Sequence, residues 1–408
     1  MFGVGIIVEI ALQEVKMKIR PMSERVHILA SIDWTRRLFD ALIPLPDGTS
    51  YNAYLVKGSE KTALLDTTDP AKAAELMTAL DEIPVVDYLI SNHAEQDHSG
   101  TIPMVLDRYP KAKLICSVKA KSMLVDLLDI AEDRIVTVED GETLPLGDRT
   151  LEFISTPWVH WPETMCTYLR EEQILFSCDF FGSHLATSEV FVPDEGHTLR
   201  GAKRYYAEIM MPFHVQIQKN LEKLAAYKIQ MIAPSHGPVY NRPALILDAY
   251  KEWVSAPPHN LVIVPYISMH HSTLKLVERL VDDLSAKGIV AQPSDMTTTD
   301  IGEFAIHLVD AATIILGTPI MLGGAHPILA NTARLAGLLK PKAMFAAFLI
   351  SYGWGIGAVD RLPELISGLK VELLPNVVMR GLPRAADLEA VDKLADLIEI
   401  KHKELGLK

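Results

Sequence analysis

The ten residues SNHAEQDHSG, positions 91–100, place four side chains that can bind a metal within six positions of the chain. These side chains are His93, Glu95, Asp97 and His98. They directly follow the apolar run VVDYLI, which predicts a buried strand. Taken alone, the stretch is also compatible with a solvated polar loop. None of the four is a cysteine, so the donors are nitrogen and oxygen.

Three later segments repeat this arrangement of a donor at the end of an apolar run. TPWVHWPETM contains His160, ILFSCDFFG contains Asp179 and MIAPSHGPV contains His236. Functional side chains are concentrated at the ends of strands in enzymes that mix strands and helices. We therefore expect these segments to meet the 93–98 stretch at one metal site.

The chain of 408 residues is 49% hydrophobic, which is enough for two or more domains. The stretch Ala256-Pro257-Pro258-His259 predicts a linker between residues 1–256 and 259–408. After it, the buried-strand runs NLVIVPYI, AATIILG and AMFAAFLIS alternate with loops and helices, which predicts a doubly wound parallel sheet. One of these helices is expected to present one apolar face, formed by Leu274, Val277, Leu280, Val281 and Leu284.

A net charge of −13 argues against nucleic acid or an anionic membrane surface as the main partner. The three cysteines form no CxxC pair and fit a reducing, cytoplasmic setting. The N-terminal MFGVGIIVEIALQEVKMK is interrupted by Glu9 and predicts neither a signal peptide nor a membrane span. Whether translation starts at Met1 or Met22 stays open.

The pattern HxExDH, followed by His160, Asp179 and the Ser-His-Gly around His236, resembles the metallo-β-lactamase fold as flavodiiron proteins use it. The resemblance implies an N-terminal αββα sandwich over residues 1–256 and a flavodoxin-like doubly wound sheet over 259–408. It also implies two iron ions. One would be held by His93, Glu95 and His160, the other by Asp97, His98 and His236, and Asp179 would bridge them.

Hydrolases of that fold usually read HxHxDH and hold two zincs, so Glu95 stands where they carry a second histidine. A carboxylate for each metal makes a harder, more anionic site that suits iron. His184 in FFGSH resembles a histidine that hydrogen-bonds around the metal ligands of the family, the alternative being an ordinary loop histidine. The N-terminal loop RRLFDALIPLPDGTSYNAY lacks the pocket histidine of some relatives, so we expect a differently lined substrate pocket.

Three loops of the second half are candidates for a phosphorylated, planar cofactor. SMHHST precedes a predicted helix, where backbone N–H groups and hydroxyls can bind phosphate, although a simple N-cap would look the same. GTPIMLGGAHP and SYGWGIGA follow the next two strands, and the second combines Tyr352 and Trp354 with glycines. All three resemble the flavodoxin domain of the flavodiiron proteins, although Ile267 and His270 depart from its usual residues.

By this resemblance the FMN-binding residues are Ser268, Met269, His270, His271, Ser272, Thr273, Thr318, Pro319, Ile320, Met321, Gly323, Ser351, Tyr352, Gly353, Trp354 and Gly355.

The family reduces dioxygen to water or nitric oxide to nitrous oxide, and the sequence does not choose between the two gases. No rubredoxin-like CxxC…CxxC module follows the second half, so we expect a separate electron donor, either a rubredoxin-like protein or a reduced deazaflavin. The resemblance also implies a head-to-tail homodimer or a dimer of such dimers. The alternatives are a dinuclear metallohydrolase fused to a flavodoxin-like domain, and a flavin electron carrier whose first domain is only a scaffold.

Overall fold

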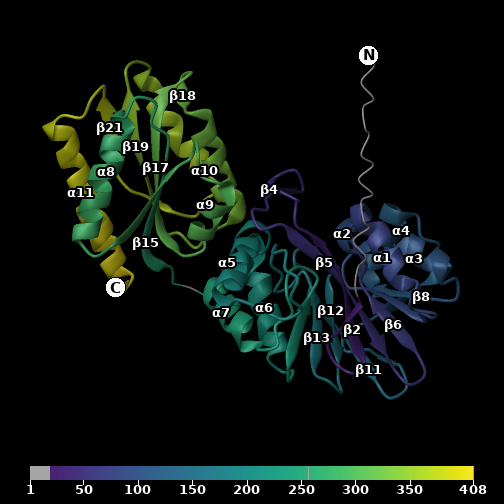
Figure 1. Ribbon diagram of the computed structural model, residues 1–408. Helices are drawn as coiled ribbons and strands as arrows, with labels where there is room; N and C mark the ends of the chain where they lie inside the picture. Colours follow the sequence, from purple (N-terminus) through teal and green to yellow (C-terminus); the bar gives the residue numbers. More distant parts are fainter. Residues whose placement is uncertain (1–18, 256, 408) are drawn as a thin grey trace, which may run out of the picture.

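The computed structural model describes residues 19–255 and 257–407, and Figure 1 shows them as two bodies joined after α7 (Ala244–Val254). The N-terminal stretch MFGVGIIVEIALQEVKMK, which we expected to be neither a signal peptide nor a membrane span, lies outside the described residues. Among the helices that are described, none is long and apolar enough to cross a membrane. β15 (His259–Tyr266) opens the second body, and the exact domain boundaries remain a prediction.

The first body is built on two sheets that face each other. The first sheet has the order β1 (Ile19–Pro21), β2 (Val26–Asp33), β5 (Thr49–Lys57), β6 (Thr62–Leu65), β7 (Tyr88–Ser91), β8 (Lys113–Ser117) and β9 (Ile135–Val138). The second has the order β10 (Thr143–Pro145), β11 (Thr150–Ser155), β12 (Met165–Leu169), β13 (Ile174–Cys178) and β14 (Met231–Pro234). A small hairpin, β3 (Leu38–Phe39) and β4 (Ile43–Pro44), projects from the first sheet.

Helices cover the outer faces of both sheets (Figure 1). The first sheet carries α1 (Ala73–Leu80), α2 (Gln96–Ser99), α3 (Ile102–Arg108) and α4 (Val118–Leu128), with the short η1 (Pro70–Lys72) and η2 (Glu132–Arg134). The second carries α5 (Glu195–Tyr205), the π-helical η3 (Tyr206–Met210), η4 (Met211–Phe213), α6 (His214–Leu224) and α7. This is the expected αββα sandwich.

The strand period of two explains how the sandwich buries three layers of apolar side chains. On β5, Tyr54 and Val56 lie in the core between the sheets, whereas Leu55 between them packs under the helices. On β11, Phe153 belongs to the inter-sheet core and the next residue, Ile154, packs under the outer helices. Both faces of each sheet are therefore buried, and the donor residues follow the strands at their ends.

The second body is a doubly wound sheet, as expected from the strand–helix alternation. Its order is β16 (Val290–Asp295), β15, β17 (Ala311–Met321), β19 (Phe345–Tyr352) and β20 (Glu372–Leu373), with β21 (Val377–Arg380) also paired to β19 and β18 (Gly324–Ala325) to β17. All pairs but β17–β18 are parallel. α8 (Ser272–Ala286) and α11 (Ala385–Glu404) cover one face, and α9 (Ile301–Leu308), α10 (Pro327–Leu339) and η5 (Ile356–Ile366) pack on the other.

The expected apolar face of α8 was mostly correct and a strand end was wrong. Val277, Leu280 and Leu284 are buried and half-buried Val281 packs against the same core, but the face also includes Leu276, and Leu274 is only half-buried. β17 does not end at Gly317 but continues to Met321, because its last residues pair with β19 and then turn back into β18.

The two bodies contact each other through a buried ionic cluster. Arg204 on α5 donates to Glu303 Oε1 at 3.0 Å and to Asp300, and its Nε lies 3.4 Å from Glu208 Oε1. A Cβ at residue 302 would lie 2.1 Å from Glu208 Oε1, so any larger residue than glycine would displace the side chains of this cluster. The cluster fixes how α9 packs against α5 and η3.

Candidate functional site

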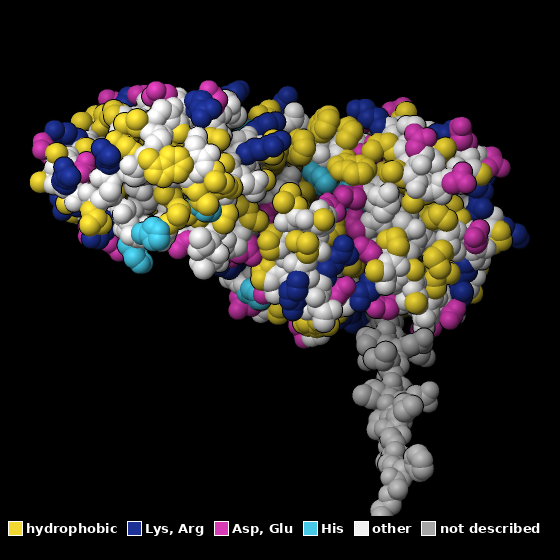
Figure 2. Space-filling view, turned by 90° about the horizontal axis from the view of Figure 1, so that it is seen from above, with side chains coloured by type: hydrophobic (Ala, Val, Ile, Leu, Met, Phe, Trp, Pro, Cys, Tyr) yellow, Lys and Arg dark blue, Asp and Glu magenta, His cyan; other side chains and the backbone are white. Residues whose placement is uncertain are grey.

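Four segments of the first body bring their donors to one place between the two sheets. His93 and Glu95 follow β7, and Asp97 and His98 lie on the short α2. His160 lies in the loop between β11 and β12, and Asp179 and His236 follow β13 and β14. Except for Glu95 and His160, which are half-buried, these side chains are buried. In Figure 2 a histidine lies in a hollow that is bordered by acidic and hydrophobic side chains.

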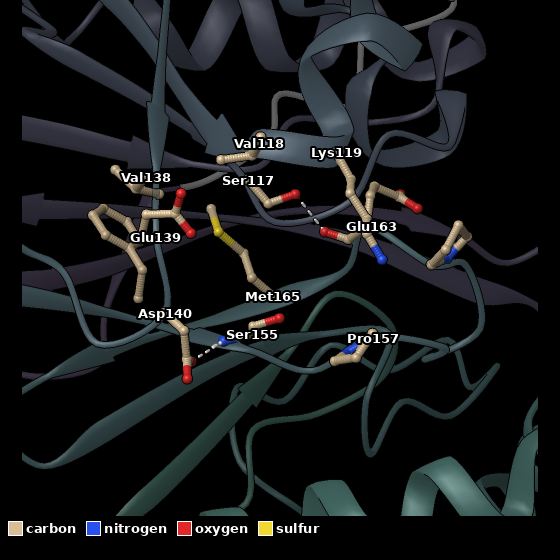
Figure 3. A pocket seen from close by; sticks show the side chains of 12 residues that line it. Ser117, Val118, Lys119, Val138, Glu139, Asp140, Ser155, Pro157, Glu163 and Met165 are labelled. Atoms are coloured by element: carbon tan, nitrogen blue, oxygen red, sulfur yellow. Dashed lines mark hydrogen bonds between the residues drawn. The ribbon is translucent and has the colours of Figure 1, made fainter.

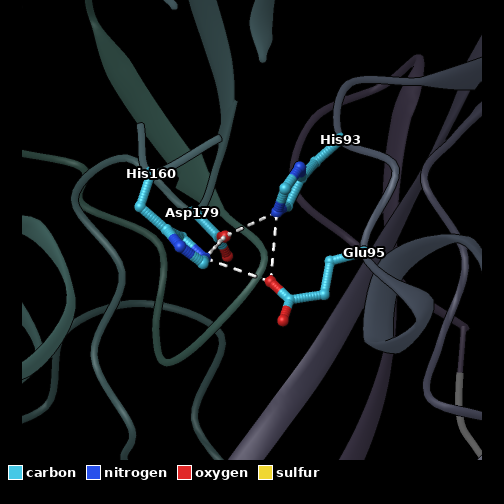
Figure 4. Close-up of side chains that lie close together, drawn as sticks. All are labelled: His93, Glu95, His160 and Asp179. Carbon is cyan, nitrogen blue, oxygen red and sulfur yellow. Dashed lines mark hydrogen bonds and ion pairs between the residues drawn. The ribbon is translucent and has the colours of Figure 1, made fainter. Parts of the chain in front are cut away.

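The first group of donors consists of His93, Glu95 and His160 together with one oxygen of Asp179 (Figure 4). Glu95 Oε2 lies 3.2 Å from His93 Nε2 and 3.0 Å from His160 Nε2. Asp179 Oδ2 lies 3.4 Å and 3.5 Å from the same two nitrogens.

The second group consists of Asp97, His98 and His236 together with the other oxygen of Asp179. Asp97 Oδ2 lies 3.2 Å from the Nε2 atoms of both histidines. Asp179 Oδ1 lies 2.9 Å from His98 Nε2 and 3.4 Å from His236 Nε2. All seven predicted ligand positions therefore meet, and Asp179 directs one oxygen to each group.

The hydrogen bonds behind two of the histidines fix which ring nitrogen faces the site. His236 Nδ1 lies 2.8 Å from the carbonyl oxygen of Ser50, which can only accept, so Nδ1 donates and the Nε2 lone pair faces the carboxylates. His93 Nδ1 lies 2.7 Å from Glu163 Oε1. Lone pairs of neutral imidazoles that face carboxylate oxygens repel each other, so each group is arranged to hold a cation.

The charges of the site also favour a bound cation. Burial opposes protonation of the four histidines, yet the surrounding carboxylates raise the pKa of His93 and His236 to about 10 and that of His98 and His160 to about 9. A field that favours a proton on every imidazole favours a metal cation in its place, because protons and metals compete for the same lone pairs.

His184 lies beside the second group without reaching its carboxylates. Its Nδ1 is 3.0 Å from Thr49 Oγ1, and its ring centroid lies 4.9 Å from that of His236. Burial and the neighbouring His236 lower the pKa of His184 well below its ordinary value, which keeps the ring neutral. A supporting role for this histidine remains a prediction.

Several residues around the site were not predicted. Phe39, on the β3–β4 hairpin, lies 5.0 Å from His184 between ring centroids, and Tyr205 lies 4.9 Å from the same ring. Burial and then the charges of Glu95 and Asp97 raise the pKa of Asp40, next to Phe39. The N-terminal loop, for which we expected a differently lined pocket, therefore brings a phenylalanine close to His184 and a carboxylate into the field of Glu95 and Asp97. Glu163, whose carboxylate reaches His93, was also missed.

In the second body, a cavity of about 250 Å³ opens at the carboxyl ends of β15, β17 and β19. It is lined by Ser268, Met269, His270, Ser272, Thr273, Pro319, Ile320, Ser351, Tyr352, Gly353, Trp354 and Gly381. Thr273 Oγ1 and Ser351 Oγ lie 2.8 Å apart, and Ser268 Oγ accepts from the backbone of Leu274, so two of the predicted loops join at the start of α8.

Five predicted flavin-site residues do not line this cavity. They are His271, Thr318, Met321, Gly323 and Gly355. Thr318 is buried and accepts a hydrogen bond from the backbone of His326, whereas Gly323 and Gly355 have positive φ in turns next to the cavity. Gly381, which follows the short strand β21, was not predicted.

Residues 49–237 match the family model described as "ODP family beta lactamase". The chain is 33% identical over 379 residues to a nitric oxide reductase from Moorella thermoacetica, covering 90% of this chain and 95% of that one. It superposes with a TM-score of 0.91 on rubredoxin oxygen:oxidoreductase from Desulfovibrio gigas, at 28% identity and with 95% of this chain and 99% of that one covered. For the flavodiiron protein from Giardia intestinalis the TM-score is 0.87, at 27% identity over 96% and 99% of the two chains.

These likenesses extend over both bodies, and the relatives that they name are oxidoreductases and flavodiiron proteins. The chain therefore belongs to the flavodiiron protein family.

Proposed function

We propose that this protein is an oxidoreductase that reduces dioxygen to water, nitric oxide to nitrous oxide, or both, at a pair of irons supplied with electrons by FMN. The observation that carries the proposal is the position of Asp179, whose two oxygens face two separate groups of histidine and carboxylate donors. The names of the relatives, one a nitric oxide reductase and one a rubredoxin oxygen:oxidoreductase, support the two gases.

The donor set fits iron. Each group offers two imidazoles, one carboxylate of its own and one oxygen of Asp179, which suits a hard cation that changes its oxidation state. His93, Glu95 and His160 would hold one iron, and Asp97, His98 and His236 the other. Bound iron would supply the site where the gas binds and part of the electrons for its reduction.

The remaining side chains orient the ligands and shield the site. Ser50 and Glu163 fix the rings of His236 and His93, and Phe39 and Tyr205 fill the space around His184. Packing of this kind excludes water from the place where the gas is reduced, which limits side reactions.

The flavin cavity fits the phosphate and ring of FMN. The start of α8 offers backbone N–H groups and the hydroxyls of Ser272 and Thr273 to a phosphate, without a lysine or arginine among the lining residues. Tyr352 and Trp354 lie beside Gly353, where a flat ring can approach the backbone closely. Bound FMN would pass single electrons to the iron site.

We further propose a head-to-tail homodimer, or a dimer of such dimers, in which the flavin of one subunit faces the irons of the other. Exposed apolar side chains flank both sites. Trp354 and Leu322, near the flavin cavity, are 69% and 80% exposed, and Trp34 and Leu42, on either side of Phe39, are 55% and 56% exposed. A pairing of these surfaces would bury both sets.

The electron donor would be a separate rubredoxin-like protein or a reduced deazaflavin, and the protein would work in the cytoplasm. A metallohydrolase is disfavoured, because Glu95 takes the place of a zinc-binding histidine and the second body has a cavity lined by hydroxyls, glycine and aromatic side chains that suits a flavin.

The proposal is tested with protein that is purified without air. We expect about two irons and one FMN per chain, and stopped-flow mixing of the reduced protein with each gas should give rapid reoxidation. Two zincs without FMN, together with hydrolase activity, would overturn it.

A further inference from the structure

In each group of donors, one histidine has a hydrogen-bond partner at Nδ1, and this partner differs between the two groups. His236 donates through Nδ1 to a neutral carbonyl, that of Ser50, at 2.8 Å. His93 meets the carboxylate of Glu163 at 2.7 Å. The other two histidines offer no comparable contrast, because neither His98 nor His160 has a hydrogen-bonded carboxylate or carbonyl behind Nδ1 among the described residues. Among the hydrogen bonds to the four imidazole rings, the difference between the two groups therefore lies at Glu163.

The direction of the Glu163 hydrogen bond follows from a second donor. The backbone N–H of Ala94 also points to Glu163 Oε1, at 3.0 Å, so this oxygen acts as an acceptor. The proton between Glu163 and His93 then belongs to Nδ1, and the Nε2 lone pair is free for the metal position that Glu95 and Asp179 also face.

Glu163 is held in place by its backbone as well as by its side chain. Ser117 Oγ, at the end of β8, donates to the carbonyl oxygen of Glu163 at 2.6 Å, as Figure 3 shows. A surface cavity of about 280 Å³ lies on this side and is lined by both residues together with Lys119, Glu139 and Asp140. The Glu163 side chain itself is 0% exposed.

The negative charge of Glu163 acts mainly on His93. Among the described residues, His93 is the one basic side chain within ion-pair distance of this carboxylate. No hydrogen-bond partner of Oε2 is present in the described part of the chain either. A buried carboxylate with a single basic partner polarises that partner strongly, because little solvent screens it.

We propose that Glu163 is a positioning residue that makes the two metal sites unequal, so that the iron on His93, Glu95 and His160 is bound more tightly than the iron on Asp97, His98 and His236. A carboxylate that accepts the Nδ1 proton fixes the ring and increases the electron density at Nε2, and a neutral carbonyl does this more weakly. The stronger donor also favours the more highly charged, oxidised state of the first iron. This inference rests on the proposed diiron function.

The test compares Glu163→Gln with the parent protein after loading with iron. Glutamine keeps the shape and an acceptor oxygen but removes the charge. We expect chelator titration to show two classes of iron in the parent, and the tighter class to weaken by about 10–100-fold in the variant while the other is unchanged. Mössbauer spectra of iron-57 protein should show a change in one of the two iron signals.

Glu152→Gln is the matched control. Glu152 is also a well-covered carboxylate, with a 13% exposed side chain, but it pairs with Arg170 and Tyr227 on the outer part of the second sheet. Its variant should release iron as the parent does. If Glu163→Gln does not fold, Glu163→Asp carries the same test, because the shorter side chain retreats from His93.

Equal weakening of both iron classes, or unchanged release in Glu163→Gln, would overturn the inference. A parent protein that binds no iron at all would instead overturn the proposed function, so the two failures can be told apart.

Discussion

Glu95 Oε2 lies 3.0 Å from His160 Nε2, although the two residues are 65 positions apart in the chain. Glu95 follows β7 of the first sheet, and His160 lies between β11 and β12 of the second. The first group of donors therefore includes side chains from both sheets. A substitution at residue 95 therefore changes the contact with His160 that links the two sheets at this group.

Glu95→His should shift the metal preference of the first site from iron towards zinc. The substitution replaces an anionic oxygen with a neutral nitrogen and restores the HxHxDH pattern of the zinc hydrolases. We expect the iron-to-zinc ratio after expression in a medium with both metals to fall several-fold. An unchanged ratio would mean that the glutamate does not set the choice of metal.

Asp179→Asn should uncouple the two groups of donors. Asp179 is the one carboxylate among the described residues that faces both groups, and an amide offers only one oxygen and no charge. We expect loss of at least one iron and a fall in gas reduction of at least about 100-fold, since even residues outside the ligand set cost 10–100-fold when removed. FMN should remain bound, as measured by its absorbance. Full activity in this variant would contradict the bridging role.

Glu208 should make the stability of the contact between the two bodies dependent on pH. Burial raises the pKa of Glu208 to about 8, and the charges of Asp300 and Glu303 act in the same direction, while Arg204 opposes them. The Arg204 guanidinium faces three carboxylates, so it neutralises the charge of Glu208 only in part. Because the folded pKa lies above that of the unfolded chain, stability should fall as pH rises from about 4.5 to 8 and then level off.

Glu208→Gln removes this titration. At pH 8 the melting temperature of the variant should exceed that of the parent, by about 2–4 °C for each kcal/mol of stability gained. Near pH 5 the two melting temperatures should be nearly equal. Glu303→Gln is a useful comparison, since Glu303 is more exposed and also pairs with Arg200. A constant difference between Glu208→Gln and the parent across this range would argue against a raised pKa.

The segments that the fold brings together at the proposed metal site each carry their own signal in the sequence, an apolar run that ends in a histidine or an acid. Glu163 has no such signal. Its importance depends on the loop after β11 folding back so that the carboxylate reaches His93, 70 positions away. A glutamate in a loop is usually solvated, and only the tertiary contact distinguishes this one.

At the end of β17 the sequence carries a clear local signal, but the tertiary structure overrides it. Gly317-Thr318-Pro319 reads as a turn, because glycine and proline usually interrupt strands. In the fold, Thr318 pairs with Ile350 and Pro319 with Ser351 on β19, and β18 extends the ladder on the other side. Proline is tolerated here because it lies close to the end of the strand.

The head-to-tail dimer predicts that two inactive variants can restore each other. The first variant carries Asp179→Asn and retains its flavin. The second carries Ser272→Glu and Thr273→Glu, which place negative charge and bulk where the phosphate would bind, and retains its irons. Thr273 is buried, and its Oγ1 lies 2.8 Å from Ser351 Oγ, so the longer glutamate side chain has no free space within the loop.

Neither variant alone should reduce dioxygen or nitric oxide. In a hybrid dimer, the flavin of the first subunit would face the irons of the second, so one of the two electron paths is intact. Mixed and re-associated subunits should regain roughly half the activity per hybrid dimer, since one of two sites works. Hybrids are identified by differently tagged subunits that purify together. If such hybrids form but remain inactive, electrons pass from flavin to iron within one chain, and the exposed apolar surfaces near Trp354 and Leu42 pair in some other way.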